Sequence, residues 1–179
     1  MGRLPVISRD KLSTENQAIW DRIMAGRSGA GGPYGALFHV PGLAERVGAV
    51  ENYFRFDGAL AQTDRELIIL ATARELGAHY PWNRHEIRGR EAGVRTEAIE
   101  ALRANGTLDA LTAHERLLVE MVRNILRRHQ VPDELFARAL AELGPEKLVE
   151  MVALIGHYCL IGSIANTFGV AVAEGTVTF

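Results

Sequence analysis

Residues 63–93, TDRELIILATARELGAHYPWNRHEIRGREAG, decide how this chain is expected to fold. The stretch opens with four polar residues and continues as a run rich in Leu, Ile and Ala, which predicts a buried helix that is apolar on nearly every side. Gly77 ends that helix, and Pro81 suits the first position of a second helix that stops at Gly93. The stretch therefore predicts two helices joined by a short polar elbow.

The same stretch carries most of the chemically useful side chains, which are Glu66, Arg74, His79, Tyr80, Trp82 and His85. Thr63 and Glu66 have the spacing of a capping box, in which the Glu66 carboxylate accepts the backbone N–H of Thr63. This capping role is compatible with a second role as a carboxylate at the mouth of a pocket. Trp82 and His85 are three residues apart and share one helix face.

The rest of the chain predicts further helices and no strands, so the expected fold class is all-α. Thr14 and Gln17 suggest a capping box for the first helix. The run 26–35 holds five glycines and a proline, and we expect a loop there that could act as a lid over a pocket. Other helices are expected over 41–56, 96–106, 113–129, 132–143 and 145–167. With the first helix, to about Ala25, and the two above, the chain is expected to have about seven to eight helices. Val170–Phe179 is expected to be a loose tail that could lie on a neighbouring subunit.

Composition narrows the class of protein. The 179 residues, 47% hydrophobic and 23% charged, predict one domain over 1–179, with 1–32 as an N-terminal extension and glycine-rich loop and 33–168 as the core. A net charge of −2 gives no reason to expect nucleic-acid or membrane binding. Cys159 is the single cysteine, which excludes an intrachain disulfide and suits the cytoplasm. We expect no signal peptide and no stretch approaching the length of a membrane span.

No metal or other cofactor is expected. His79, His85, Glu66 and Glu86 are the residues that come closest to a ligand set. They lack the HExxH or paired ExxH spacing of known metal sites, and His85 and Glu86 point in different directions on a helix.

The order of these short motifs resembles the carboxymuconolactone decarboxylase family, which shares its fold with alkylhydroperoxidase D. The matching words are RELIILATARELGAHYPWNRHEIRGREAGV, followed by GHY at 156–158 and by Asn166 and Phe168, and the resemblance spans about 33–168. It implies an alkylhydroperoxidase D-like helical bundle that assembles as a homo-oligomer, a trimer or a hexamer, with sites near subunit boundaries.

The redox branch of that family uses a Glu, a Cys-x-x-Cys pair and a His four residues after the second Cys. By this resemblance the Glu falls on Glu66 and the His on His85, whereas Ala78 and Pro81 replace the two thiols and Tyr80 takes the place of an intervening histidine. A peroxide-reducing cycle needs a thiolate, so peroxidase activity is not expected. Cys159 lies in an apolar helix and is interpreted as a core residue.

The decarboxylase branch needs no cysteine, and it implies a cofactor-independent lyase or isomerase acting on a small carboxylated lactone or aromatic-derived compound. His85 would donate or accept the proton and Glu66 would be its partner. Arg74 or Arg88 could hold the carboxylate, and the remaining predicted substrate-binding residues are Tyr80, Trp82, Tyr34 and His39. His157 and Tyr158 are interpreted mainly as core residues. The alternative is a non-catalytic binding or assembly protein on the same scaffold.

Overall fold

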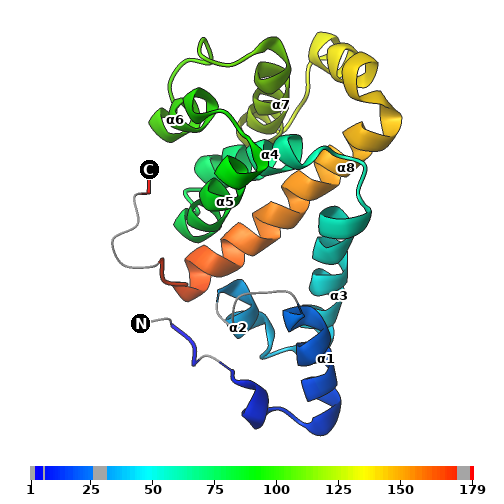
Figure 1. Ribbon diagram of the computed structural model, residues 1–179, viewed down its shortest axis with the longest axis vertical. Helices are drawn as coiled ribbons and strands as arrows, with labels where there is room; N and C mark the ends of the chain where they lie inside the picture. The colour runs from blue at the N-terminus through cyan, green and yellow to red at the C-terminus, as the bar shows by residue number, and fades with distance from the viewer. Residues whose placement is uncertain (1–2, 6, 26–31, 173–177) are drawn as a thin grey trace. The chain divides into compact units, whose positions relative to one another are not determined.

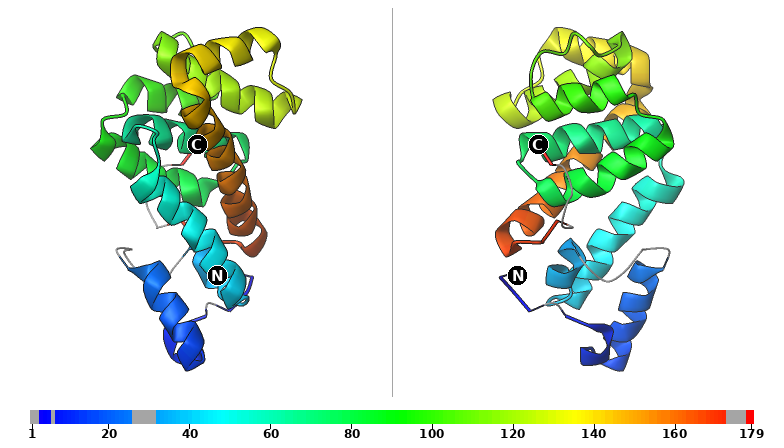
Figure 2. Two further views of the ribbon diagram at one scale, coloured as in Figure 1. Left: turned by 90° about the vertical axis from the view of Figure 1, so that its right-hand side faces the viewer. Right: turned by 60° about the vertical axis from the view of Figure 1, so that its left-hand side comes forward.

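The computed structural model describes residues 3–5, 7–25, 32–172 and 178–179, and over these residues the chain is helical with no strand, as predicted (Figures 1 and 2). The chain divides into two compact units. Unit 1 holds Met1–Gly58 with Ile164–Ala171, and unit 2 holds Ala59–Ser163 with Val172–Phe179. The prediction of a single domain remains a prediction, and the two units are described separately.

Unit 1 contains short helices around a small aromatic core. Its elements are η1 (Arg9–Lys11), α1 (Thr14–Met24), α2 (Pro33–Leu37), α3 (Pro41–Asn52), the π-helical turn η2 (Tyr53–Asp57) and the end of α8. Trp20 of α1 packs against Phe38 with ring centroids 4.4 Å apart, and Ile23, Val47 and Phe54 are buried with them. Burial of these apolar side chains stabilises the unit.

Two local expectations in unit 1 were wrong. The cap of α1 is Ser13, whose side chain accepts the backbone N–H of Asn16, so the box predicted between Thr14 and Gln17 does not form. The predicted loop 26–35 contains the first residues of α2, because a proline at the start of a helix needs no backbone partner. Residues 26–31 lie outside the described residues, so the proposed lid does too.

Unit 2 is organised around one buried helix. Its elements are α4 (Gln62–Glu75), α5 (His79–Ala92), α6 (Thr96–Ala104), α7 (Ala113–Arg123), the π-helical turn η3 (Asn124–Arg128) and most of α8 (Asp133–Phe168). Figures 1 and 2 show α5 lying beside α4, which also contacts α6 and α7. All eight residues from Glu66 to Ala73 are buried, which confirms the prediction of a central helix that is apolar on nearly every side.

The helix ends of unit 2 mostly follow the local signals. Gly93 ends α5 with φ of 90°, a left-handed conformation that favours glycine. Thr112 and Glu115 form both bonds of the predicted capping box at α7. Gly144, with φ of 72° and ψ of 169°, interrupts α8 just before Pro145, where a break was predicted. The start of α4 departs from the expectation, since it follows Ala61 with no side-chain cap. The start of α5 departs too: the helix begins at His79, so Pro81 is its third residue and not its first, still within the first turn, where the missing N–H needs no partner.

In the described part of the chain, α8 is the one helix long and apolar enough to cross a membrane by length and composition. This corrects the expectation that no stretch would approach that length. More than half of its most apolar stretch is buried within the fold, which is typical of the core helix of a soluble protein.

The α8 helix crosses the elbow between α4 and α5 at a glycine. A Cβ at Gly162 would lie 3.1 Å from Cδ1 of Leu76 and 3.2 Å from Cβ of Ala78. Contacts this short force neighbours to move, and Ala78 has no flexible end that could give way. The absence of a side chain at Gly162 therefore sets how closely α8 can approach the elbow.

We predict that Gly162→Ala lowers stability relative to Gly156→Ala, a matched change on the same helix. Gly156 is exposed and its added Cβ meets nothing within 4 Å, so the alanine should raise the free energy of unfolding by about 0.5–1 kcal/mol. In urea unfolding, the free energy of unfolding of Gly162→Ala should be at least about 1 kcal/mol lower than that of Gly156→Ala. An equal gain for both variants would contradict the close crossing.

His114 ties three helices of unit 2 together. It contacts Glu142 through Nδ1 and Asp64 through Nε2, the latter at 2.9 Å. Partial burial lowers the pKa of His114, but hydrogen bonds and charge from Glu142 and Asp64 outweigh it, so the pKa is raised above its ordinary value. The protonated ring therefore stabilises the fold.

We predict that His114→Gln lowers the melting temperature by about 1–2 °C at pH 6, because ion pairs this exposed contribute little. A raised folded pKa gives stability that is fully present below the unfolded value and is lost as the pH rises through the folded value. The difference in melting temperature between wild type and His114→Gln should therefore be smaller at pH 9 than at pH 6. His129→Asn, at an exposed left-handed position, is the control. A constant difference across this range would disprove the ion-pair role.

Candidate functional site

A buried carboxylate–histidine pair joins the two helices of the elbow. Glu66 on α4 and His85 on α5 are 3% and 6% exposed, and Oε2 of Glu66 lies 2.6 Å from Nδ1 of His85. Gly89 lies one turn after His85, and a Cβ there would be 3.7 Å from Cβ of Glu66 and 3.4 Å from Leu70. A small residue at position 89 therefore lets α5 approach α4 closely enough for the pair to form.

Tyr158 extends this pair into a chain of three groups. It comes from α8, is 6% exposed, and its hydroxyl lies 3.0 Å from Nε2 of His85. The two rings meet edge to face, with centroids 5.0 Å apart and planes at 89°. Both nitrogens of His85 are thus hydrogen-bonded, one to Glu66 and the other to Tyr158.

The charge of Glu66 is stabilised by its neighbours. Burial raises the pKa of the Glu66 carboxyl, but the hydrogen bond and charge of His85, with Arg65 and Arg88, outweigh burial and hold it below its ordinary value. Nε of Arg65 lies 3.7 Å from Oε1 of Glu66. A carboxylate that stays ionised accepts the Nδ1–H of His85 and so fixes the ring tautomer.

This geometry allows a proton to move along the chain. With a neutral imidazole, Nδ1–H donates to Glu66 and Nε2 accepts the hydroxyl proton of Tyr158. When Nε2 takes up that proton, the resulting imidazolium lies beside the Glu66 carboxylate, which stabilises its charge. The three residues can therefore accept or donate one proton at Tyr158 or His85, which is general acid–base chemistry.

The elbow offers no thiol beside this chain of groups. Ala78 and Pro81 are both buried, and the Cβ of Ala78 packs where α8 crosses at Gly162. The single cysteine, Cys159, is half-buried on α8, and burial raises the pKa of its thiol. A raised pKa lowers the thiolate fraction, so Cys159 is a poor nucleophile.

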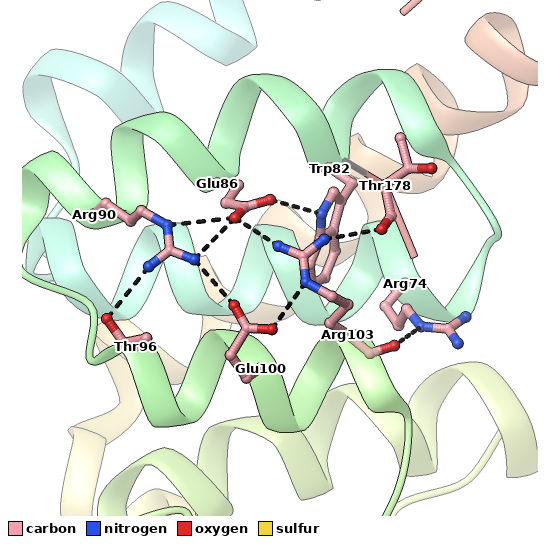
Figure 3. A network of polar contacts seen from close by, with 8 residues as sticks. All are labelled: Arg74, Trp82, Glu86, Arg90, Thr96, Glu100, Arg103 and Thr178. Atoms are coloured by element: carbon pink, nitrogen blue, oxygen red, sulfur yellow. Dashed lines mark hydrogen bonds and ion pairs between the residues drawn. The ribbon is translucent and has the colours of Figure 1, made fainter. Parts of the chain in front are cut away.

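Arg74 and Trp82 take part in a separate network, which joins α5 to α6 and includes Arg74 near the end of α4 (Figure 3). Arg74 is eight residues after Glu66, about 12 Å along the helix axis. Its Nε donates to the carbonyl of Arg103, and the indole Nε1 of Trp82 donates to Glu86 at 3.1 Å. These two predicted substrate-binding residues therefore make no hydrogen bond to His85.

The other predicted residues are dispersed. Arg88 is half-buried and influences the charge of Glu66, and Tyr80 is half-buried at the start of α5. Tyr34 and His39 belong to unit 1, where Tyr34 donates to Glu51 at 2.7 Å and Nε2 of His39 lies 2.9 Å from the carbonyl of Pro5. Their role in substrate binding remains a prediction.

Tyr158 is a site residue whose sequence context predicts only a core position. The GHY motif at 156–158 is part of the family resemblance and could have pointed to Tyr158. An aromatic residue in an apolar helix is, however, usually a core residue. Its position in the chain gives no indication of a partner, because Tyr158 and His85 are 73 residues apart. Among the described residues, no group of three or more His, Cys, Asp or Glu could hold a metal ion.

Comparison with known proteins agrees with this fold. Residues 41–124 match the profile of the carboxymuconolactone decarboxylase family. A similar solved structure is the alkylhydroperoxidase AhpD core of an uncharacterized peroxidase-related protein from Ralstonia eutropha JMP134, with a TM-score of 0.79 and 21% sequence identity. The match covers 97% of this chain and 93% of that chain. A search of curated proteins found no match.

The protein thus has an all-helical, alkylhydroperoxidase D-like fold with a buried Glu–His–Tyr chain. The match to the carboxymuconolactone decarboxylase family covers a little under half of the chain and agrees with the resemblance seen in the sequence. The chain has Ala78 and Pro81 where the redox branch of that family has its two cysteines. At 21% identity the structural likeness bears on the fold alone.

We predict that Glu66→Gln lowers the free energy of unfolding by about 1–3 kcal/mol at pH 7, because it removes a charge-assisted bond from a buried histidine. A lowered folded pKa gives stability that is present above the ordinary carboxyl value, about 4.3, and is lost as the pH falls through the folded value. Urea unfolding should therefore show wild type and variant converging below about pH 4.

The control for this prediction is Glu146→Gln, an exposed carboxylate on α8. It should change stability by less than about 0.5 kcal/mol at either pH. If Glu66→Gln were as mild as this control at pH 7, the Glu66–His85 bond would not be a structural element of the fold.

Proposed function

We propose that the protein is a cofactor-independent lyase or isomerase that acts on a small carboxylated lactone or a related aromatic-derived compound, with His85 as proton donor or acceptor. The observation that carries the proposal is the buried chain from Glu66 through His85 to Tyr158, with bonds of 2.6 and 3.0 Å. A fully hydrogen-bonded histidine between an ionised carboxylate and a phenol is suited to moving one proton.

The reaction class follows from what the chain of groups can supply. Loss of CO2 from an unsaturated acid leaves an electron pair on carbon or on an enolate oxygen, and a proton must then be delivered there. An isomerisation needs the same group to remove a proton and return it. Tyr158 or His85 would deliver the proton, and Glu66 would keep the imidazolium stable until the proton has moved.

The structure favours Arg88 over Arg74 as the group that holds the substrate carboxylate. Arg88 is half-buried on α5, three residues after His85, and it lowers the pKa of Glu66. Arg74 lies near the far end of α4 and contacts Arg103 and Phe179 instead. A guanidinium beside the proton donor could bind a carboxylate through paired hydrogen bonds.

Peroxide reduction of the dithiol type is disfavoured on chemical grounds. It requires a thiolate and a second thiol to form a disulfide, and Ala78 and Pro81 supply neither. Cys159 is a single thiol with a raised pKa. The proposal therefore follows the decarboxylase branch of the family.

We further propose a cytoplasmic homo-oligomer, a trimer or a hexamer, with a small molecule as substrate and no nucleic-acid or membrane partner. Exposed apolar side chains on α8 support self-association, since Val149 is 69% exposed and Val152 and Leu160 lie along the same helix. A homo-oligomer would cover such side chains.

A second candidate is a binding protein that keeps the scaffold without the reaction. It is favoured by Phe179, whose ring lies over Arg74 and beside Trp82, two residues predicted to bind substrate. In that case changes at Glu66 or His85 would alter ligand affinity and no rate would exist to be changed.

We predict that wild-type protein removes CO2 from, or isomerises, at least one carboxylated lactone or ring-cleavage product in a mass-spectrometric screen. His85→Gln should lower the rate by about 10²–10⁴-fold, and Tyr158→Phe should lower it and change its pH profile. Helical content and thermal stability of each variant show whether it has folded. His114→Gln, which lies outside this site, is the control and should keep the wild-type rate.

The outcomes separate the two candidates. Turnover that survives His85→Gln would refute the proposed role of His85. Saturable binding without conversion, in wild type and variants alike, would favour the binding protein.

A further inference from the structure

Phe179 occupies a slot made of two cations and two rings in unit 2. Its ring stacks on His79 with centroids 4.5 Å apart and planes at 23°, and it meets Trp82 edge to face at 5.1 Å. The guanidinium of Arg74 lies over the Phe179 ring, 4.3 Å from its centroid. We call the residues Arg74, His79, Trp82 and Arg103 the aromatic slot.

The fourth member of the slot binds the neighbouring backbone. Nη1 of Arg103 donates to the carbonyl of Thr178 at 2.9 Å, and its guanidinium lies 5.3 Å from the Trp82 ring (Figure 3). Thr178 and Phe179 therefore present one hydrogen-bond acceptor and one aromatic ring to the slot. That pair of groups is the recognition pattern of an aromatic compound that carries a carbonyl or carboxylate oxygen.

The slot is held in place by bonds that do not involve residues 178–179. Arg103 is paired with Glu86 at 2.5 Å and with Glu100 at 3.0 Å, and Arg90 bridges both carboxylates (Figure 3). Arg74 donates to the Arg103 carbonyl. Because these bonds fix both guanidinium groups, the slot keeps its geometry whichever aromatic group fills it, which favours binding.

The positive charge of Arg74 is available to a bound anion. It forms no ion pair with any carboxylate in the described part of the chain, while Arg103 is already neutralised by Glu86 and Glu100. Its guanidinium there contacts the Arg103 carbonyl and the face of the Phe179 ring, neither of which is an anion. A ligand with both a ring and a carboxylate would bring to these guanidinium groups a negative charge that the Thr178 carbonyl and the Phe179 ring do not supply.

We propose that the aromatic slot is a binding site for arylalkanoates, compounds with an aromatic ring and a carboxylate on a short flexible chain, and that Thr178 and Phe179 are its intramolecular occupant. Binding displaces Phe179 from Arg74, His79 and Trp82. The proposal rests on the proposed function only in the class of ligand, a carboxylated aromatic-derived compound, because binding at the slot requires no turnover.

The probe follows from covalent structure. In 4-phenylbutanoate the carboxyl carbon is joined to the ring by a chain as long as the N–Cα–Cβ link between the Thr178 carbonyl and the Phe179 ring. The matched control is 4-cyclohexylbutanoate, which has the same charge and length but no aromatic face. A reporter is available because the chain has only two tryptophans, Trp82 in the slot and Trp20 in unit 1.

The experiment is a titration of full-length ¹⁵N-labelled protein followed through its two indole N–H resonances, assigned with Trp20→Phe. We expect 4-phenylbutanoate to shift the Trp82 resonance saturably and to leave Trp20 unchanged. Phe179→Ala should tighten binding about tenfold, because the competing ring is removed. Arg74→Gln should weaken it about tenfold, and 4-cyclohexylbutanoate should bind at least as weakly.

Phe136→Ala, at an exposed phenylalanine on α8, is the control and should leave the affinity unchanged. Equal binding of the two acids, or no effect of Phe179→Ala on a folded protein, would overturn the proposal. Binding at Trp82 without turnover of any compound would support the binding site and refute the proposed lyase activity. Turnover with no shift of the Trp82 resonance would support the lyase activity and refute the binding site.

Discussion

The hydrogen bond between Glu66 and His85 is the interaction on which the site depends. Moving a carboxylate and an imidazole out of water is costly, and an isolated buried charge would not remain ionised. Here the cost is offset because Glu66 has His85, Arg65 and Arg88 around it, and its pKa falls below the ordinary value despite burial. The apolar surface of α4 holds the pair in position, since Leu67 to Ala73 pack on every side and leave Glu66 at the start of the buried stretch facing α5.

The elbow and α8 turn this pair into a chain of three groups. Gly162 lets α8 cross close to Ala78, so that Tyr158, one turn earlier on α8, reaches His85. Where the redox branch of the family has thiols, this protein has Ala78 and Pro81, both buried. Ala78 and Pro81 contribute packing and no reactive group. The chemistry that Glu66, His85 and Tyr158 can supply is proton transfer. This is why the proposed reaction is a decarboxylation or an isomerisation.

Local sequence signals predicted most helix ends because they act over a few residues. Gly93, Gly144 and the Thr112–Glu115 box each determine a backbone conformation through nearby atoms. The same reasoning failed at Thr63–Glu66, where the carboxylate forms a tertiary bond in place of a cap, because a buried histidine is a better partner for a charge than a backbone amide. Glu66 and His85 could be named from the family resemblance. Tyr158 and the Phe179 contacts could not, since each joins segments more than seventy residues apart through side-chain packing that has no local signature.

The state of the His85 ring tests the central claim most directly. In protein labelled with ¹⁵N-histidine, NMR distinguishes the two ring nitrogens and reports which one carries a proton. The account predicts that the neutral ring of His85 carries its proton on Nδ1, since Glu66 accepts that proton, and that Nε2 accepts the hydroxyl of Tyr158. Glu66→Gln should abolish this preference in a protein that remains folded. A neutral ring with its proton on Nε2 and none on Nδ1 would contradict the account, because Glu66 could then not be the partner of His85.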